Sequence, residues 1–268
     1  MTLDFPLTFS PILKERIWGG DKLTTVFKKG SEKTGIGESW ELSDVEGDIS
    51  IVSNGPLEGK SLKNLIKTYK GKLVGEKVYE AFGNSFPILI KYIDAKTPLS
   101  IQVHPSNELA KTRHNSFGKN EMWYIMEAED KAELIVGFNQ EITQESYKRK
   151  LDEGQILEVL NTEEISKGDT FYIPTGRVHA IGAGVVLAEI QQTSDVTYRI
   201  YDYKRVDAKT GKERELHTDL ALDAIDYKLH DTYKTLYTLK ENKSSELVYS
   251  PYFKTNIIQL KGTMNKDY

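Results

Sequence analysis

Short runs of β-branched and aromatic residues recur along most of this chain, and Pro, Gly and Asn separate them at brief intervals. Runs of this kind, bounded by turn-forming residues, are typical of antiparallel strands in a sandwich or barrel. The predicted strands cover residues 49–53, 87–94, 99–103, 122–128, 132–137, 170–173 and 185–192, with more strand structure within 246–260. The pattern therefore predicts a mainly β fold.

Helical patterns interrupt these strands. Ser61, Ser106 and Thr143 are suitable N-caps for the segments that follow them. The predicted helices cover residues 62–69, 73–82, 107–114, 144–160 and 219–226. Because they do not alternate regularly with strands, as βαβ units would, we interpret them as insertions in a β-rich frame.

The composition excludes several classes of site and partner. The chain has no cysteine, so disulfides, thiolate nucleophiles, iron–sulfur clusters and Cys-type zinc sites are ruled out. Its 36 Lys and Arg residues against 40 Asp and Glu residues give a net charge of -4, which argues against a nucleic-acid partner. Neither a signal peptide nor an apolar run long enough for a membrane helix is visible, so we expect a cytoplasmic protein.

A glutamine and a histidine are spaced to share one face of a strand. Residues two apart on a strand point to the same side, so Gln102 and His104 project together, and Pro105 ends the strand after them. Val103 then faces a core. The pair suits metal coordination, although a polar solvent-facing strand containing a chance histidine would look the same.

A second histidine follows a turn rich in Gly and Pro. Residues 168–179 (GDTFYIPTGRVH) predict a turn, a short buried strand and a Pro-Gly turn that delivers His179. Glu121, between the two histidine segments at the start of a strand, is the candidate third ligand, although a lone Glu at a strand edge is often solvated. Two imidazoles, a carboxylate and an amide oxygen would suit zinc, and also manganese or iron.

The segment 189–202 (EIQQTSDVTYRIYD) is dense in hydrogen-bonding side chains and places Arg199 among aromatic residues. A restrained arginine binds phosphate or stabilises an oxyanion well. An ordinary surface pair between Arg and Asp is the alternative interpretation.

These segments resemble known families. The 168–179 pattern is similar to the second motif of cupin barrels, although Q-x-H stands where their first motif usually has an H-x-H pair. The whole set resembles the type I mannose-6-phosphate isomerases in their short bacterial form. The matching stretches are 18–20 (WGG), 37–44 (GESWELSD), 86–106 (FPILIKYIDAKTPLSIQVHPS), 119–125 (KNEMWYI), 174–184 (PTGRVHAIGAG) and 189–205 (EIQQTSDVTYRIYDYKR).

The resemblance implies a cupin-type jelly-roll barrel with helical insertions and a short C-terminal β segment. We expect a catalytic domain over residues 1–215, and a C-terminal helix with a partial second β domain over 216–268. The resemblance also implies one Zn²⁺ ion per chain. Its ligands would be Gln102, His104, Glu121 and His179.

The implied substrate is a hexose 6-phosphate, and the implied reaction interconverts mannose 6-phosphate and fructose 6-phosphate through an enediolate. Arg199 matches the active-site arginine of the family, and Ser100 matches a serine near the phosphate. Arg205, by its spacing from Arg199, matches a basic phosphate contact, and Lys91 is a further basic residue of the site. Glu189 is the first candidate for the general base and Asp195 the second.

Two other functions stay open on the sequence. One is a cupin isomerase that acts on another sugar or sugar phosphate, and the other is a non-catalytic cupin that binds a sugar phosphate. Retention of Glu189, Arg199 and the whole ligand set favours catalysis, because a binding module would not need a base. We expect a monomer or a weak homodimer.

Overall fold

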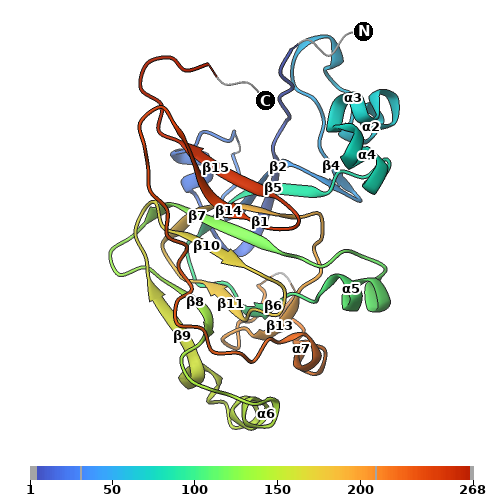
Figure 1. Cartoon of the computed structure of the whole chain (residues 1–268). Helices are drawn as coiled ribbons and strands as arrows, with labels where there is room; N and C mark the ends of the chain where they lie inside the picture. The colour runs from blue at the N-terminus through green and yellow to red at the C-terminus, as the bar shows by residue number, and fades with distance from the viewer. Residues whose placement is uncertain (1–4, 31, 209, 266–268) are drawn as a thin grey trace.

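Two antiparallel sheets form the body of the protein (Figure 1). The computed structural model describes residues 5–30, 32–208 and 210–265. The first sheet has the strand order β1-β2-β5-β12-β7-β10 and the second has the order β13-β6-β11-β8-β9. The strands of the first sheet are β1 (Ile12–Gly20), β2 (Ile36–Leu42), β5 (Ile88–Ala95), β12 (Val185–Gln192), β7 (Glu121–Ala128) and β10 (Thr170–Ile173). Those of the second are β13 (Tyr198–Tyr201), β6 (Ile101–Val103), β11 (His179–Ile181), β8 (Glu133–Phe138) and β9 (Leu160–Glu164).

The main core lies between the two sheets. Trp123 and Leu187 from the first sheet belong to the same buried cluster as Leu134, Val136 and Ile181 from the second. All of these side chains are at most 2% exposed. Removal of such apolar surface from water is the dominant favourable contribution to folding. The predicted mainly β fold is confirmed.

The helices lie outside the sheets. They are α1 (Lys22–Thr25), α2 (Leu62–Tyr69), α3 (Gly71–Val74), α4 (Glu76–Phe82), α5 (Asn107–His114), α6 (Gln144–Asp152) and α7 (Thr218–Ala224), with 3-10 turns at Gly55–Leu57 and Ile156–Val159. Helices α2 to α4 gather at one end of the molecule and α6 lies at the other (Figure 1). The predicted caps are confirmed, since Ser61, Ser106 and Thr143 accept hydrogen bonds from backbone N–H groups inside α2, α5 and α6.

The predicted helix over 144–160 is wrong in its second half. Helix α6 ends at Asp152, and Gly154 has a φ of 71°, a left-handed conformation that glycine adopts without strain. A 3-10 turn follows, and Leu160 then starts β9, which pairs with β8. The apolar residues after Gly154 resemble a continued helical face, although they pack through a turn and a strand instead.

Other boundaries also differ from the prediction. The strand expected over 49–53 is the two-residue β4 (Asp48–Ile49), paired with β3 (Asp44–Val45). The prediction missed β1 and β2, because charged residues such as Glu15, Arg16 and Glu38 hide their alternation.

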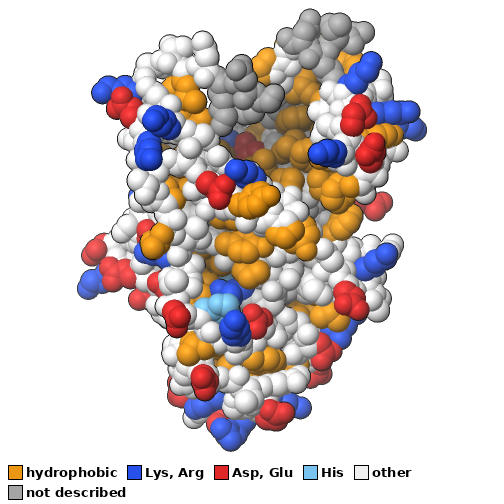
Figure 2. Space-filling view, viewed as in Figure 1, with side chains coloured by type: hydrophobic (Ala, Val, Ile, Leu, Met, Phe, Trp, Pro, Cys, Tyr) orange, Lys and Arg blue, Asp and Glu red, His pale blue; other side chains and the backbone are white. Residues whose placement is uncertain are grey.

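The C-terminal strands form a separate hairpin of β14 (Ser244–Tyr249) and β15 (Lys254–Ile258). Leu247 and Val248 pack against Met122 of β7, which fixes the hairpin on the first sheet. Hydrophobic side chains gather on the face that carries this hairpin (Figure 2). The domain boundary expected between 215 and 216 stays a prediction. Ala221 of α7 is buried in the same cluster as Ile101 and Val103 of β6, so the helix after this boundary packs on the second sheet.

The structure has no helix among the described residues that is long and apolar enough to cross a membrane.

Substitution of the inter-sheet core should be costly. Leu134→Ala removes a fully buried side chain, and we expect it to lower the free energy of unfolding by about 2–5 kcal/mol. The control Leu236→Ala changes a side chain that is 87% exposed and should alter stability by less than about 0.5 kcal/mol. Chemical denaturation of the metal-free protein measures both, and equal effects would contradict the assigned core.

Candidate metal centre and active-site cavity

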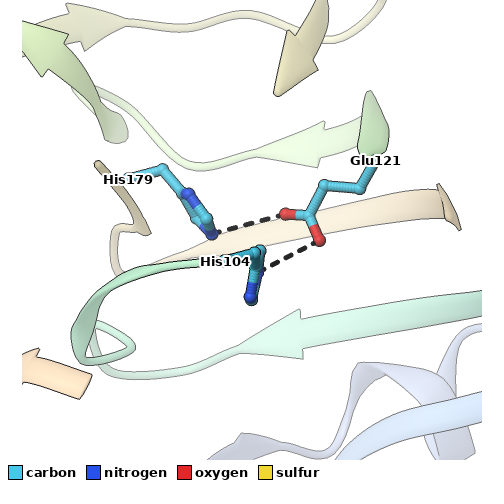
Figure 3. A group of neighbouring side chains, drawn as sticks. All are labelled: His104, Glu121 and His179. Atoms are coloured by element: carbon cyan, nitrogen blue, oxygen red, sulfur yellow. Dashed lines mark ion pairs between the residues drawn. The ribbon is translucent and has the colours of Figure 1, made fainter. Parts of the chain in front are cut away.

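His104, Glu121 and His179 converge between the two sheets (Figure 3). His104 directly follows β6, Glu121 is the first residue of β7 and His179 is the first residue of β11. Nε2 of His179 lies 3.4 Å from Oε1 of Glu121, and Nε2 of His104 lies 3.4 Å from Oε2. All three side chains are buried, so the strand ends hold three potential ligand atoms together away from solvent.

Backbone carbonyl groups fix the orientation of both imidazoles. Nδ1 of His104 lies 3.0 Å from the carbonyl oxygen of Val196, and Nδ1 of His179 lies 2.8 Å from that of Arg177. Because a carbonyl can only accept, each Nδ1 carries the proton and each Nε2 presents a lone pair to Glu121. This arrangement is the one that metal-ligating histidines usually adopt.

The charge states of these groups also suit a cation. Burial lowers the pKa of both histidines, that of His179 to about 3, so the imidazoles are neutral. Burial raises the pKa of Glu121, but the ammonium of Lys119 and the adjacent rings of His104 and His179 together outweigh this effect and hold the pKa well below its ordinary value. Neither buried oxygen of Glu121 receives a hydrogen bond of ordinary geometry, although Nζ of Lys119 lies 2.8 Å from Oε2. The carboxylate of Glu121 faces the Nε2 lone pairs of both histidines, and this set of electron-pair donors suits a divalent cation.

Gln102 lies beside this group. It is paired with His179 across the β6–β11 ladder, and its Nε2 atom is 3.3 Å from Nε2 of His179. The amide nitrogen and oxygen are interchangeable by a half-turn of the side chain, which would place Oε1 toward the same point. The structure therefore brings together all four residues that the sequence nominated as ligands.

A cavity of about 500 Å³ opens next to these residues. It is a polar cavity, and its lining includes Trp18 and Trp40 of the first sheet and Gln102 of the second. Its charged lining residues include Lys91, Lys119, Glu189, Asp195, Arg199 and Arg214. Its size matches that of pockets that hold small molecules.

Glu189 is tightly held inside the cavity wall. Its Oε1 atom lies 2.9 Å from Nζ of Lys91 and 3.7 Å from Nζ of Lys119, and its Oε2 atom accepts a 2.8 Å hydrogen bond from Trp123. Strand register explains the contacts, because Lys91 of β5 and Trp123 of β7 both pair with Glu189 of β12. Glu189 is thus a buried counter-ion, with Oε2 hydrogen-bonded to Trp123 and Oε1 in ion pairs with Lys91 and Lys119 but without a hydrogen bond of ordinary geometry.

Lys91 and Glu38 extend the charged row across the first sheet. Burial lowers the pKa of Lys91, but the carboxylates of Glu189 and Glu38 outweigh it and raise the pKa above its ordinary value. Burial likewise raises the pKa of Glu38, whereas Lys91, Arg16 and the indole of Trp40 lower it to about 2. Each buried charge is therefore compensated by a neighbour.

The other wall of the cavity carries Arg199 and Ser100. Nε of Arg199 donates to Oγ of Ser100 at 3.3 Å, and Nη1 donates to the carbonyl of Glu215 at 2.8 Å. Burial and the neighbouring guanidinium of Arg214 lower the pKa of Arg199. Asp195 is exposed at the rim of the cavity.

Arg205 does not lie where the sequence placed it. It is absent from the cavity lining, and its guanidinium is paired with Asp202 and donates to the carbonyl of Pro98. Tyr203 and Lys204, with φ values of 55° and 52°, form a left-handed turn between Asp202 and Arg205. Arg214 returns to the cavity instead, held by a 2.7 Å bond from its Nε to Asp202.

Sequence reasoning missed several charged residues of this site, among them Lys119 and Arg214. Lys119 lies two positions before Glu121, and the i, i+2 rule could have found it had the strand been extended backwards. Arg214 reaches the cavity from a loop and is held there by Asp202, which directly follows β13. No periodic pattern in the sequence predicts such a contact between a loop and a distant strand end.

The two sheets with a histidine–carboxylate centre between them define a cupin-type protein with a candidate metal site. Comparison with known proteins then narrows the class. The family model for the catalytic domain of type I phosphomannose isomerase matches residues 7–149. Mannose-6-phosphate isomerase ManA of Bacillus subtilis is 37% identical over 265 residues, which are 96% of this chain and 80% of that protein. The probable mannose-6-phosphate isomerase GmuF of the same organism is also 37% identical, with the same coverage.

Solved structures agree with this result. The crystal structure of the mannose 6-phosphate isomerase from Bacillus subtilis superposes with a TM-score of 0.84 at 33% identity, and the match covers 93% of this chain and 78% of that one. A phosphomannose isomerase from Salmonella typhimurium shares the fold with a TM-score of 0.72 at 15% identity, over 90% and 80% of the two chains. The chain belongs to the type I phosphomannose isomerase family.

The depressed pKa of Glu38 predicts a pH dependence of stability. Its folded pKa of about 2 lies below the ordinary value of 4.5, so its contribution to stability is present above pH 4.5 and is lost as the pH falls toward 2. Over that window a single such group changes the free energy of unfolding by at most about 1.4 kcal/mol per pH unit. Denaturation of wild type and Glu38→Gln at pH 5 and pH 3 should show a shallower decrease in the variant, and parallel decreases would exclude the assigned ion pairs.

Proposed function

We propose that this chain interconverts mannose 6-phosphate and fructose 6-phosphate in the cavity beside His104, Glu121 and His179. The observation that carries the proposal is the convergence of three buried ligand atoms beside a cavity that contains Arg199 and Arg214, in a member of this family. The cavity brings these two guanidinium groups into the same space as the amide of Gln102. A sugar phosphate has matching chemistry, with adjacent oxygens on C1 and C2 and a dianion at the far end.

Zn²⁺ is the ion that we assign to the centre. Two neutral imidazoles, a carboxylate and the amide oxygen of Gln102 are ligand types that zinc accepts. When bound, a divalent ion polarises carbonyl and hydroxyl oxygens as a Lewis acid. Lys119 lies 3.2 Å from Nε2 of His104 and 2.8 Å from Oε2 of Glu121, so its ammonium would remain next to any ligand oxygen at the centre.

The phosphate end of the substrate would lie against Arg199, Arg214 and Ser100. Arginine presents several N–H donors in a plane that matches phosphate oxygens. The Arg199 guanidinium is oriented by Ser100 and by the Glu215 carbonyl, and Asp202 orients Arg214. These restraints reduce the entropy that binding a dianion would cost.

Aldose–ketose isomerisation moves a proton between C2 and C1 through an enediolate, so a base must reach the carbon skeleton. Of the two candidates, Asp195 is the one that the geometry favours. Glu189 already neutralises Lys91 and accepts from Trp123, whereas Asp195 is exposed to the cavity and to solvent. Glu189 would then act as a positioning residue that holds Lys91 and Lys119 for the developing negative charge.

The cytoplasmic location and the monomeric or weakly dimeric state stay predictions.

Loss of a ligand should remove metal and activity together. We expect His104→Ala and His179→Ala to lose bound metal and the conversion of fructose 6-phosphate into mannose 6-phosphate, because each leaves an incomplete ligand set. Elemental analysis and a coupled assay measure the two quantities. Chelation of the wild type should abolish turnover, and added Zn²⁺ should restore it. Full metal occupancy in either variant would disprove the assigned ligands.

The base can be identified by a matched pair of amide substitutions. Asp195→Asn should lower kcat about 10²–10⁴-fold and stop the uptake of deuterium from D₂O into the substrate. Glu189→Gln should retain measurable exchange, since the base would still be present. The reverse result, with exchange lost only in Glu189→Gln, would make Glu189 the base.

Arg214 and Arg205 provide a second matched pair. Arg214→Met should raise KM for fructose 6-phosphate by about 10-fold or more, because a charge-assisted bond to phosphate is removed. Arg205→Met should leave KM nearly unchanged, since its guanidinium is held by Pro98 and Asp202 and does not line the cavity. Steady-state kinetics compare them, and a larger effect at Arg205 would restore the assignment based on spacing.

A further inference from the structure

The segment after α7 lies along the segment that carries His179. It connects α7 to the β14–β15 hairpin (Figure 1). The amide of Asp226 donates to the carbonyl of Gly176 at 2.8 Å, and the amide of Thr235 donates to the carbonyl of Thr170 at 2.8 Å. The two segments therefore run antiparallel. We call residues 226–237 the clamp segment.

One end of this contact is linked to the candidate metal centre by two hydrogen bonds that involve backbone groups of Gly176 and Arg177. The amide of Gly176 donates to the carbonyl of His104 at 2.9 Å. The carbonyl of Arg177 accepts the Nδ1 proton of His179 at 2.8 Å. The turn formed by Gly176 and Arg177 thus touches both histidines, and any movement of this turn changes the orientation of His179.

Among the described residues, the side chain of Arg177 makes its polar and aromatic contacts with the clamp segment alone. Its guanidinium lies over the ring of Tyr233 at 4.8 Å, and its Nη2 atom is 3.1 Å from Nε2 of His230. Arg177 is 8% exposed although it carries a charge. A cation–π interaction that is shielded from water is more favourable in free energy than one at the surface.

Tyr233 is also hydrogen-bonded to β8, the strand that pairs with His179. Its hydroxyl donates to the carbonyl of Phe138 at 2.9 Å and accepts from the amide of Phe138 at 3.1 Å. A Cβ on Gly137 would lie 2.4 Å from the Tyr233 ring, so the glycine makes room for this contact. Because Val136 of the same strand pairs with His179, Tyr233 supports the histidine from a second direction.

We propose that Arg177 and Tyr233 are positioning residues for the metal centre, through which the clamp segment fixes the orientation of His179. This inference rests on the proposed metal site. Neither side chain lines the cavity, so the effect operates through the backbone carbonyl of Arg177 and the register of β8. Contacts that orient a ligand in this way commonly account for 10-fold to 100-fold in metal affinity.

The test compares the two ends of the clamp segment in the full chain. Arg177→Met keeps the aliphatic stem and removes the guanidinium from Tyr233. The control Lys234→Met removes the 2.8 Å ion pair to Asp169, at the end far from His179. Competition with a chromophoric chelator measures Zn²⁺ affinity, the absorption spectrum of the Co²⁺-loaded protein reports ligand geometry, and thermal unfolding of the metal-free protein checks the fold.

We expect Arg177→Met to lower Zn²⁺ affinity about 10-fold or more and to alter the Co²⁺ spectrum, whereas Lys234→Met stays within about twofold of the wild type. Equal affinity in Arg177→Met and wild type, or equal losses in both variants, would overturn the proposal. Should Arg177→Met not fold, His230→Ala removes the contact at Nη2, together with the ring contact to Tyr233 and the pair with Asp226 inside the clamp segment, and it should weaken binding in the same direction. Unchanged affinity in a folded His230→Ala would then overturn the proposal.

His179→Ala separates this inference from the proposed metal centre. Loss of Zn²⁺ binding in His179→Ala, with normal binding in Arg177→Met, would overturn the role of the clamp segment alone. Normal binding in His179→Ala would overturn the centre itself.

Discussion

A carboxylate without ordinary hydrogen bonds is buried between two neutral imidazoles, and much of the structure serves to keep it there. An isolated buried charge of this kind is expensive, and Glu121 is tolerated because Lys119 lies against it and because its neighbours are held by backbone carbonyls. The two sheets supply these groups from different strands. The packing of one sheet against the other therefore determines the geometry of the centre, since Glu121 belongs to the first sheet and His179 to the second.

The register of the first sheet explains how several charges can share one interior. Lys91, Glu189 and Trp123 occupy paired positions on three adjacent strands, so their side chains lie in a row with charge and hydrogen-bond partners side by side. A shift of one residue on any of these strands would point its member of the row to the opposite face. Binding residues here depend on β-sheet pairing as strictly as the apolar core does.

Local patterns in the sequence were sufficient for part of this description. The spacing of Gln102 and His104, and the Pro-Gly turn before His179, were readable because strand periodicity and turn chemistry act over a few residues. The strands β1 and β2 were missed because Glu15 and Glu38 find partners only in the folded state. Arg205 was misplaced for a similar reason, since spacing along the chain does not reveal the left-handed turn at Tyr203 and Lys204 that directs it to Pro98.

Asp202 holds two arginines at once, of which Arg214 lines the cavity and Arg205 does not. The described residues of the loop between them contribute no strand to either sheet. The histidines and Glu121 lie instead on strands or directly after one. Under the proposed function, a contact to phosphate therefore comes from this loop and the metal ligands come from the sheets, so substrate preference can diverge between related proteins through the loop while the chemistry at the metal is preserved.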